Sequence, residues 1–324
     1  MTESLHEPVL LEEALAALAI RPGDTVLDAT LGGAGHFSRI LAALGTSVDG
    51  ERGVVIGIDA DPAAVERARE AYALDRRPER PAAHLVNDNF RNLARVLDRL
   101  GVGRVDAALF DLGWSGYQLA ALKGFSFSRA DEPLLMTYGE GEGGETAAGI
   151  VNSASAEELT RILREYGEER FAREIAREIV RTREKARILT VGDLVGAVER
   201  ATPAWYRRQR THAATKTFQA LRMAANDELG ALAEGLAAAL AALAPGGRLA
   251  VITFHSIEDR AVKRFLREAE AAGAGESASK KPVAPTRAEV AKNRRARSAK
   301  LRIFIKHSSV SAIAAAPASA FSYV

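Results

Sequence analysis

Short apolar runs alternate with amphipathic segments in the first third of the chain. The runs that have the length and β-branched content of strands are residues 25–30, 53–61, 83–90 and 105–113. The segments with apolar positions at helical spacing are 37–45, 62–72 and 91–101. Strand and helix in strict alternation predict an α/β fold with a parallel sheet.

The alternation stops after Gly113 and resumes at residues 228–243, an expected helix, and 245–254, a fifth expected strand. Between them lies a charged helical stretch at 155–184, and Ser155 followed by Glu158 predicts a capping box at its start. We therefore expect a helical domain inserted into a sheet domain. The expected parts are residues 1–118 and 213–310 for the sheet domain, 119–212 for the insertion, 272–286 as a mobile linker and 311–324 as a flexible tail.

Composition excludes several classes of protein. The 324 residues are 47% hydrophobic and include no cysteine, which excludes disulfides, thiolate nucleophiles and cysteine-ligated metals. The six histidines are scattered, so we expect no metal site. The first residues carry acids where a signal peptide carries bases, and the most apolar window, 230–247, is too short for a membrane span. A cytoplasmic protein that does not contact a membrane is expected.

Basic residues are concentrated although the net charge is only +2. They gather at 177–187, 205–212 and 292–302. The first cluster fits a solvated helix face as well as it fits a binding surface. The last cluster contains four arginines and two lysines and no acid, and such a segment favours a phosphate backbone as partner.

The sequence DATLGGAGH at residues 28–36 joins the first strand to the first helix. Such a glycine-rich turn lets backbone amides approach a nucleotide-like ligand. A dinucleotide site requires GxGxxG, which is absent here, whereas a short GxG motif with Gly33 and Gly35, preceded by Asp28, is typical of S-adenosylmethionine sites. Asp59, at the end of the second strand, suits the ribose hydroxyls of either cofactor.

The next strand ends favour S-adenosylmethionine. Asn87 to Phe90 place polar groups and an aromatic ring where an adenine would lie, with a core position as the alternative for Phe90. Asp111 ends an apolar strand, and a carboxylate in that position faces a cleft.

Several segments together resemble one family, the RsmH (MraW) ribosomal RNA small-subunit methyltransferases. They include HEPVLLEEAL, DATLGGAGH, GIDADP, YGEERFAREIAREIV, ATKTFQALRMAANDEL, APGGRLAVITFHSIEDRAVKRF and NRRARSAKLR. The resemblance implies a Rossmann-like class I methyltransferase sheet with a helical substrate-recognition insertion, S-adenosyl-L-methionine as donor, and N4 of a decoding-centre cytidine in 16S rRNA of the small ribosomal subunit as target. The donor contacts that it implies are Ala34, Gly35, His36, Asp59, Phe90, Asp111 and Gln118.

Two loops depart from the family pattern. DLGWSGYQLA stands where the family has DLGVSSxQLD, and DEPLLMTYG stands where it has DxPLDMRM. The glycines and acids expected to bind the donor are intact. The changes therefore concern substrate contacts and not the cofactor.

The amine of cytosine is a weak nucleophile and needs an acceptor for its N–H. Asp111 is the expected acceptor, and His255 is a second candidate, with a helix cap as its alternative role; Ser256 and Asp259 also fit an N-cap signature. For an extruded base, the stacking candidates are Trp114, Tyr117, Phe125 and Phe127. The residues expected to contact the RNA are Ser115, Arg222, Asn226, Arg294, Arg295 and Arg297.

Three other functions are less well supported by the sequence. A nicotinamide dehydrogenase lacks its GxGxxG motif, and a DNA cytosine-N4 methylase lacks its PPY turn. A noncatalytic ribosome-assembly factor that binds S-adenosylmethionine is supported only by the two altered loops. The sequence leaves open whether the protein is a homodimer.

Overall fold

The computed structural model describes residues 8–45, 48–75, 77, 80–113, 122–127, 129–138 and 145–308. The chain forms two compact units. The first contains Met1–Ser115 and Leu229–Val324, and the second contains Gly116–Glu228. A helical unit is thus inserted into a unit built on a sheet.

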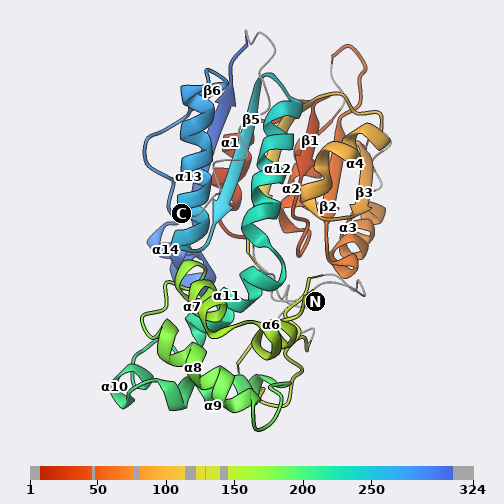
Figure 1. Ribbon diagram of the computed structural model, residues 1–324. Helices are drawn as coiled ribbons and strands as arrows, with labels where there is room; N and C mark the ends of the chain where they lie inside the picture. Colours follow the sequence, from red (N-terminus) through yellow and green to blue (C-terminus); the bar gives the residue numbers. More distant parts are fainter. Residues whose placement is uncertain are drawn as a thin grey trace. The chain divides into compact units, whose positions relative to one another are not determined.

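A seven-stranded sheet forms the centre of the first unit, in the order β3-β2-β1-β4-β5-β7-β6 (Figure 1). The first five strands pair in parallel, and β7 pairs antiparallel with both β5 and β6. The strands are β1 Thr25–Asp28, β2 Val54–Asp59, β3 Ala82–Asn87, β4 Val105–Asp111, β5 Leu243–Thr253, β6 Gly275–Ser277 and β7 Lys300–Lys306. The predicted α/β class with a parallel sheet is confirmed.

Helices cover both faces of this sheet, which is why its central strands are apolar throughout. On one face, α1, α2 and α3 pack on strand residues such as Val26 and Leu109. Figure 1 shows α12 and α13 in front of the sheet and α1 behind it. The helices of this unit are α1 Leu11–Leu18, α2 Gly35–Ala43, α3 Pro62–Leu74, η1 Phe90–Asn92, α4 Leu93–Arg99, α12 Glu228–Ala242, α13 Ser256–Ala271, α14 Arg287–Lys292 and η2 Arg294–Ser298.

The expected mobile linker at 272–286 is wrong. Ala274 is buried, β6 begins at Gly275 and pairs with β7, and Val283 forms a bridge to Leu301. The sequence analysis also missed β7, because its alternating KLRIFIK continues the basic cluster at 292–302. The expected flexible tail at 311–324 lies outside the described residues.

The second unit is helical and has its own core. Its helices are α6 Ala147–Ser153, α7 Ala156–Glu165, α8 Ala172–Arg183, α9 Val191–Ala201, α10 Ala204–Arg207 and α11 Thr215–Ala225. The Ser155 side chain caps α7 by accepting a hydrogen bond from the Glu158 amide, which confirms the N-cap of the predicted capping box, whereas the Glu158 carboxylate binds Arg161. Among the helices that the structure describes, none is long and apolar enough to cross a membrane.

The expected continuous helix at 155–184 is in fact two helices. A Cβ on Gly167 would lie 2.7 Å from the Lys216 carbonyl oxygen, and Glu168 has a φ of 49°. The buried Glu169 carboxylate then accepts hydrogen bonds from the Phe171 amide and the Tyr206 hydroxyl. These contacts fix the change in chain direction between the end of α7 and the start of α8.

The insertion ends later than predicted. The sequence suggested that the sheet domain resumes at residue 213, but α11 packs on α6 and α7, and its Phe218 and Leu221 belong to the core of the helical unit. The chain returns to the first unit only at Leu229.

One buried charge cluster joins α13 to β7. The Asp259 carboxylate, only 8% exposed, pairs with Lys300 at 2.8 Å and with Arg302 at 2.7 Å. Burial raises the pKa of Asp259, but the hydrogen bonds from the two cations outweigh that effect, so its pKa lies below the ordinary value. The ionised carboxylate therefore stabilises the fold at neutral pH.

We expect Asp259→Asn to lower the free energy of unfolding by about 2 kcal/mol at pH 7, because it leaves two cations without their shared carboxylate. Denaturant titrations at several pH values measure this loss. Because the folded-state pKa is lowered, the stabilisation is complete above the unfolded pKa and disappears as the pH falls. The difference from wild type should therefore shrink below about pH 4.

Arg264→Gln is the control, since its pair with Glu268 spans 3.8 Å on an exposed face. That variant should lose less than about 0.5 kcal/mol. An Asp259→Asn protein as stable as wild type at pH 7 would contradict the assigned role.

Candidate active site

The turn after β1 is fixed by backbone bonds to both neighbouring strands. The Ala29 amide donates to the Leu109 carbonyl on β4, and the Leu31 amide donates to the Ile58 carbonyl on β2. The turn then passes through left-handed backbone at Gly32, with φ 50°, and at Ala34, with φ 59°. A glycine-rich turn therefore lies at the carboxyl edge of the sheet, as the sequence predicts.

Helix α2 begins at Gly35 and has no side-chain cap. A Cβ on Gly35 would lie 2.3 Å from the Pro8 ring, so only glycine lets the segment before α1 approach this closely. The first amides of α2 remain available, and the positive end of the helix dipole favours an anionic group there. This terminus suits the carboxylate of an amino-acid ligand.

Three predicted residues meet at a buried point below this turn. Asp28 is fully buried at the end of β1, and His36 is 5% exposed in the first turn of α2. The Nδ1 atom of His36 lies 3.3 Å from Oδ2 of Asp111, and its Nε2 lies 3.2 Å from the Val9 carbonyl oxygen. The imidazole thus links β4 to the segment before α1.

Burial and neighbouring charge raise the pKa values of Asp28 and His36 for different reasons. Desolvation raises the pKa of Asp28 to about 7, although His36 and the Thr30 amide act in the opposite direction. Burial of the His36 ring opposes its protonation, but the Asp111 carboxylate and Asp28 outweigh this and raise the pKa of His36. The cluster therefore changes its charge near neutral pH.

Two carboxylate oxygens of this cluster are buried without a hydrogen-bond partner among the described residues. They are Oδ2 of Asp28 and Oδ1 of Asp111. A buried acceptor without a partner costs free energy, so such atoms indicate a missing donor group. Two carboxylates that lie beside one another favour a cationic ligand.

Asp59 lies beside the same turn. Its two oxygens accept hydrogen bonds from the Gly32 amide and the Asp61 amide, each at 2.8 Å. Burial raises its pKa to about 6 against these two bonds. Each oxygen keeps a lone pair, so the carboxylate can still accept hydroxyl donors from a ribose.

Phe90, at the start of η1, is half-buried: its ring contacts another core ring, and part of the side chain stays exposed. Its ring packs edge-on against Phe110, with centroids 5.6 Å apart, and a Cβ on Gly235 would come within 2.7 Å of it. Both suggested roles are therefore compatible with its position, since one edge belongs to the core.

His255 is the N-cap of α13. Its Nδ1 accepts from the Glu258 amide at 3.4 Å, and its Nε2 lies 3.0 Å from Oε1 of Glu258. The expected cap at Ser256 is wrong by one residue, and Asp259 instead pairs with Lys300 and Arg302. His255 comes shortly after β5, the strand that pairs with β4 at Asp111. The hydrogen bond from the Leu112 amide to the Ile252 carbonyl continues this pairing toward His255.

The structure gives Arg222 and Asn226 internal partners. Arg222 is 6% exposed and binds both oxygens of Glu228, at 2.7 and 2.9 Å. Asn226 accepts from the Tyr138 amide and donates to the Met136 carbonyl. The burial of Arg222 argues against its predicted contact with RNA, and both side chains instead hold α11 within the helical unit.

The aromatic candidates separate into core and surface. Phe125 is 6% exposed and stacks on Tyr138, whereas Phe127 is 39% exposed and stacks on His212 with centroids 4.4 Å apart. The predictions for Trp114, Ser115, Tyr117 and Gln118 lie outside the described residues.

The predicted basic segment lies in η2. Arg294, Arg295 and Arg297 are exposed, whereas Ala296 between them is buried. The Asn293 side chain starts this turn by accepting from the Arg295 amide. The buried alanine fixes the segment to the sheet unit and leaves the arginines facing solvent.

The sequence analysis missed two groups at this site. The Thr30 hydroxyl accepts a hydrogen bond from the Asp111 amide at 2.7 Å, and the Val9 carbonyl holds His36. Thr30 lies two residues after Asp28, where β1 ends, and precedes the glycines, so a hydroxyl in that position was a signal. A backbone carbonyl gives no such signal, because any residue supplies one.

The sheet, the open turn and the acids at the ends of β1, β2 and β4 define a Rossmann-like class I methyltransferase whose cofactor is S-adenosyl-L-methionine. The chain belongs to the MraW methylase family, whose model matches residues 3–307.

Curated relatives agree with this membership. A protein of Symbiobacterium thermophilum named ribosomal RNA small subunit methyltransferase H is 45% identical, covering 93% of this chain and 96% of its own. Proteins with the same name from Deinococcus radiodurans and Geobacter sulfurreducens are 46% and 47% identical, covering 92% of this chain and 88% and 97% of theirs.

The site fits this cofactor. S-adenosylmethionine carries a sulfonium and an ammonium cation, a carboxylate and a ribose diol. The unpartnered oxygens of Asp28 and Asp111 suit the cationic groups, the uncapped start of α2 suits the carboxylate, and Asp59 suits the diol.

We expect the affinity for S-adenosylmethionine to rise with pH through about 7. A cationic ligand favours ionised Asp28, whose pKa is raised to about 7, and loss of the His36 proton acts in the same direction. Below that pH, affinity should fall by up to about tenfold per unit. Calorimetry from pH 5.5 to 8.5 measures this profile, and Asp28→Asn should flatten it.

Asp24→Asn is the matched control, since burial also raises the pKa of Asp24 but this residue precedes β1 at the opposite end of the strand. It should keep the wild-type profile. If the Asp28→Asn protein shows the same slope as wild type, Asp28 does not control donor binding.

Proposed function

We propose that this methyltransferase transfers a methyl group to N4 of a decoding-centre cytidine in 16S rRNA of the small ribosomal subunit. The observation that carries the proposal is the buried, unpartnered Oδ1 of Asp111 at the carboxyl end of β4. The names of the relatives, at 43–47% identity over nearly the full chain, support an rRNA substrate.

Asp111 is held in a way that suits an acceptor for the cytosine amine. Its amide donates to Thr30 and its Oδ2 lies against His36, so the carboxylate is fixed while its Oδ1 has no hydrogen-bond partner among the described residues. Accepting one amine hydrogen localises the nitrogen lone pair and orients it for in-line attack. The bound cofactor supplies an electrophilic methyl group on its sulfonium.

During transfer the N–C bond forms as the C–S bond breaks, and the amine nitrogen then loses one proton. Asp111 is the first candidate to receive that proton, because its carboxylate already accepts the N–H. His255 is the second candidate. Its cap uses Nδ1 as acceptor, which leaves the proton of a neutral ring on Nε2 beside Glu258. His255 can therefore receive the amine proton only at Nδ1, after the Glu258 amide has released that atom, and the Glu258 carboxylate beside Nε2 would stabilise the resulting imidazolium.

Contact with RNA requires exposed cations. Arg294, Arg295 and Arg297 lie on the surface of the sheet unit, and we assign them to phosphate oxygens. Arg222 and Asn226 act on the substrate only through the helix that they position. Ser115, which follows β4 in the sequence and lies outside the described residues, is proposed to contact the base.

The proposal predicts that labelled S-adenosylmethionine will methylate small ribosomal subunits from cells that lack this enzyme. Nucleoside analysis should find N4-methylcytidine at a single decoding-centre position. Large subunits and small subunits that already carry the modification are the controls and should take up no label. Label on another base, or donor binding without transfer, contradicts the proposal, and the latter result favours the noncatalytic assembly factor.

Two substitutions separate the roles at the site. Asp111→Asn should lower the rate of transfer at least about a hundredfold, because the amide is a weaker acceptor. His255→Asn keeps a good N-cap residue, so thermal stability should stay near wild type while the rate falls. Single-turnover rates and donor binding are measured together. Full activity in either variant removes that residue from the catalytic step.

A further inference from the structure

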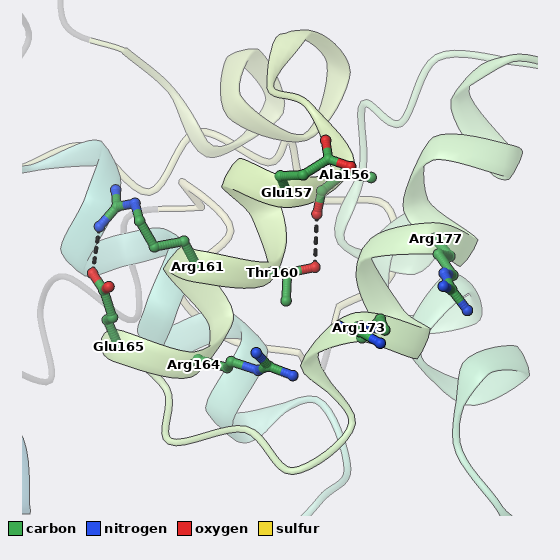
Figure 2. Close-up of a pocket in the computed structure, with 8 residues that line it drawn as sticks. All are labelled: Ala156, Glu157, Thr160, Arg161, Arg164, Glu165, Arg173 and Arg177. Carbon is green, nitrogen blue, oxygen red and sulfur yellow. Dashed lines mark hydrogen bonds and ion pairs between the residues drawn. The ribbon is translucent and has the colours of Figure 1, made fainter.

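The helical unit contains a pocket of about 610 Å³ between α7 and α8. Figure 2 shows its lining residues, with Arg164 of α7 pointing toward Arg173 at the start of α8. The lining is Ala156, Glu157, Thr160, Arg161, Arg164, Glu165, Arg173 and Arg177. Four arginines against two glutamates give the pocket an excess of positive charge.

One of the four arginines is neutralised locally. Arg161 pairs with Glu158 at 2.7 Å and also with Glu165, to which it is turned in Figure 2. This pairing raises the pKa of Arg161 further above its already high value and lowers that of Glu158. Arg161 therefore has little charge left to offer a ligand.

The other three arginines differ from it. Arg164, Arg173 and Arg177 are exposed, and no carboxylate lies within ion-pair distance of them in the part of the chain that the structure describes. The buried face of α8 consists of Ala172, Ile175, Ala176 and Ile179, so Arg173 and Arg177 project outward, one turn apart. Like charges at this spacing repel one another, and an anion between them would remove the repulsion.

The lining indicates which anion fits. Guanidinium groups bind phosphate oxygens through paired N–H donors. The lining has no aromatic side chain on which a base could stack, since Ala156 and Thr160 are its only uncharged members. The site therefore suits a phosphodiester backbone and does not read base identity.

We propose that this pocket, defined by Arg164, Arg173 and Arg177, binds the phosphate backbone of the RNA substrate. The assignment rests on the proposed function, which supplies the RNA. The site adds affinity without sequence preference, while the sheet unit provides the chemistry. It also assigns a function to Arg177, the first residue of the basic cluster at 177–187, for which the sequence did not distinguish a solvated helix face from a binding surface.

The test is the triple variant R164Q/R173Q/R177Q, with binding to protein-free 16S rRNA measured from 50 to 300 mM salt. Each lost phosphate contact should lower the slope of log K against log salt by about 0.7 to 0.9, or about 2 in total. KM for the subunit should rise several-fold, while kcat and the Kd for S-adenosylmethionine stay unchanged. The corresponding triple lysine variant keeps the charge and should recover most of the slope.

The matched control is R39Q/R69Q/R264Q, which removes the same charge from arginines that are paired with Glu12, Glu66 and Glu268 on the sheet unit. Its slope should stay within about 0.5 of wild type. Thermal unfolding of all variants checks folding, and the three target side chains are exposed, so little change is expected.

Each outcome decides the matter. A glutamine variant with an unchanged salt slope and KM, in an enzyme that methylates normally, overturns the pocket and leaves the proposed function intact. Failure of wild type to methylate RNA overturns the function, while the binding slopes still report on the pocket. If the variant binds protein-free rRNA normally but intact subunits weakly, the partner is an acidic ribosomal protein and the RNA assignment is wrong.

Discussion

The buried imidazole of His36 connects the parts of the donor site. It lies against Asp111 on β4 and the Val9 carbonyl, while Asp28 of β1 acts on it electrostatically. This arrangement requires the register that pairs Asp28 with Leu109, the turn that starts α2, and the close approach of Pro8 to Gly35. A fully buried Asp28 and a largely buried Asp111 are unfavourable as two carboxylates without a compensating charge. The free protein therefore holds the site in a form that a cation stabilises.

The sheet was predictable because its chemistry is local. Parallel strands covered on both faces are apolar throughout, and this pattern marks β1 to β5 in the sequence. We did not predict β7 from the sequence, because its residues Lys300, Arg302 and Lys306 extend the pattern of the basic segment before it. Two of these cations are in fact bound to Asp259 of α13. A sequence pattern does not show a pairing between residues so far apart.

The end of the insertion and the fate of Arg222 show the same limit. An amphipathic helix displays an apolar face but does not reveal which core receives it, so α11 was assigned to the wrong unit. Arg222 looked like a substrate contact until the structure showed its bidentate pair with Glu228. In contrast, Asp28, Asp59 and Asp111 were found from the sequence, because acids that end buried strands have few structural uses. The contact of the Val9 carbonyl with His36 is visible only in three dimensions.

The position of β7 within the sheet has a consequence for the order in which the chain can fold. This strand, Lys300–Lys306, lies between β5 and β6, so residues that are made after both of its neighbours fill an interior place in the sheet. The helical unit is contiguous in sequence and can fold as soon as it leaves the ribosome. Until β7 has been made, β5 has an unpaired edge in the sheet and β6 has no partner strand. A nascent chain therefore exposes an apolar strand edge until β7 has been made, and this interval is when it is most prone to aggregate.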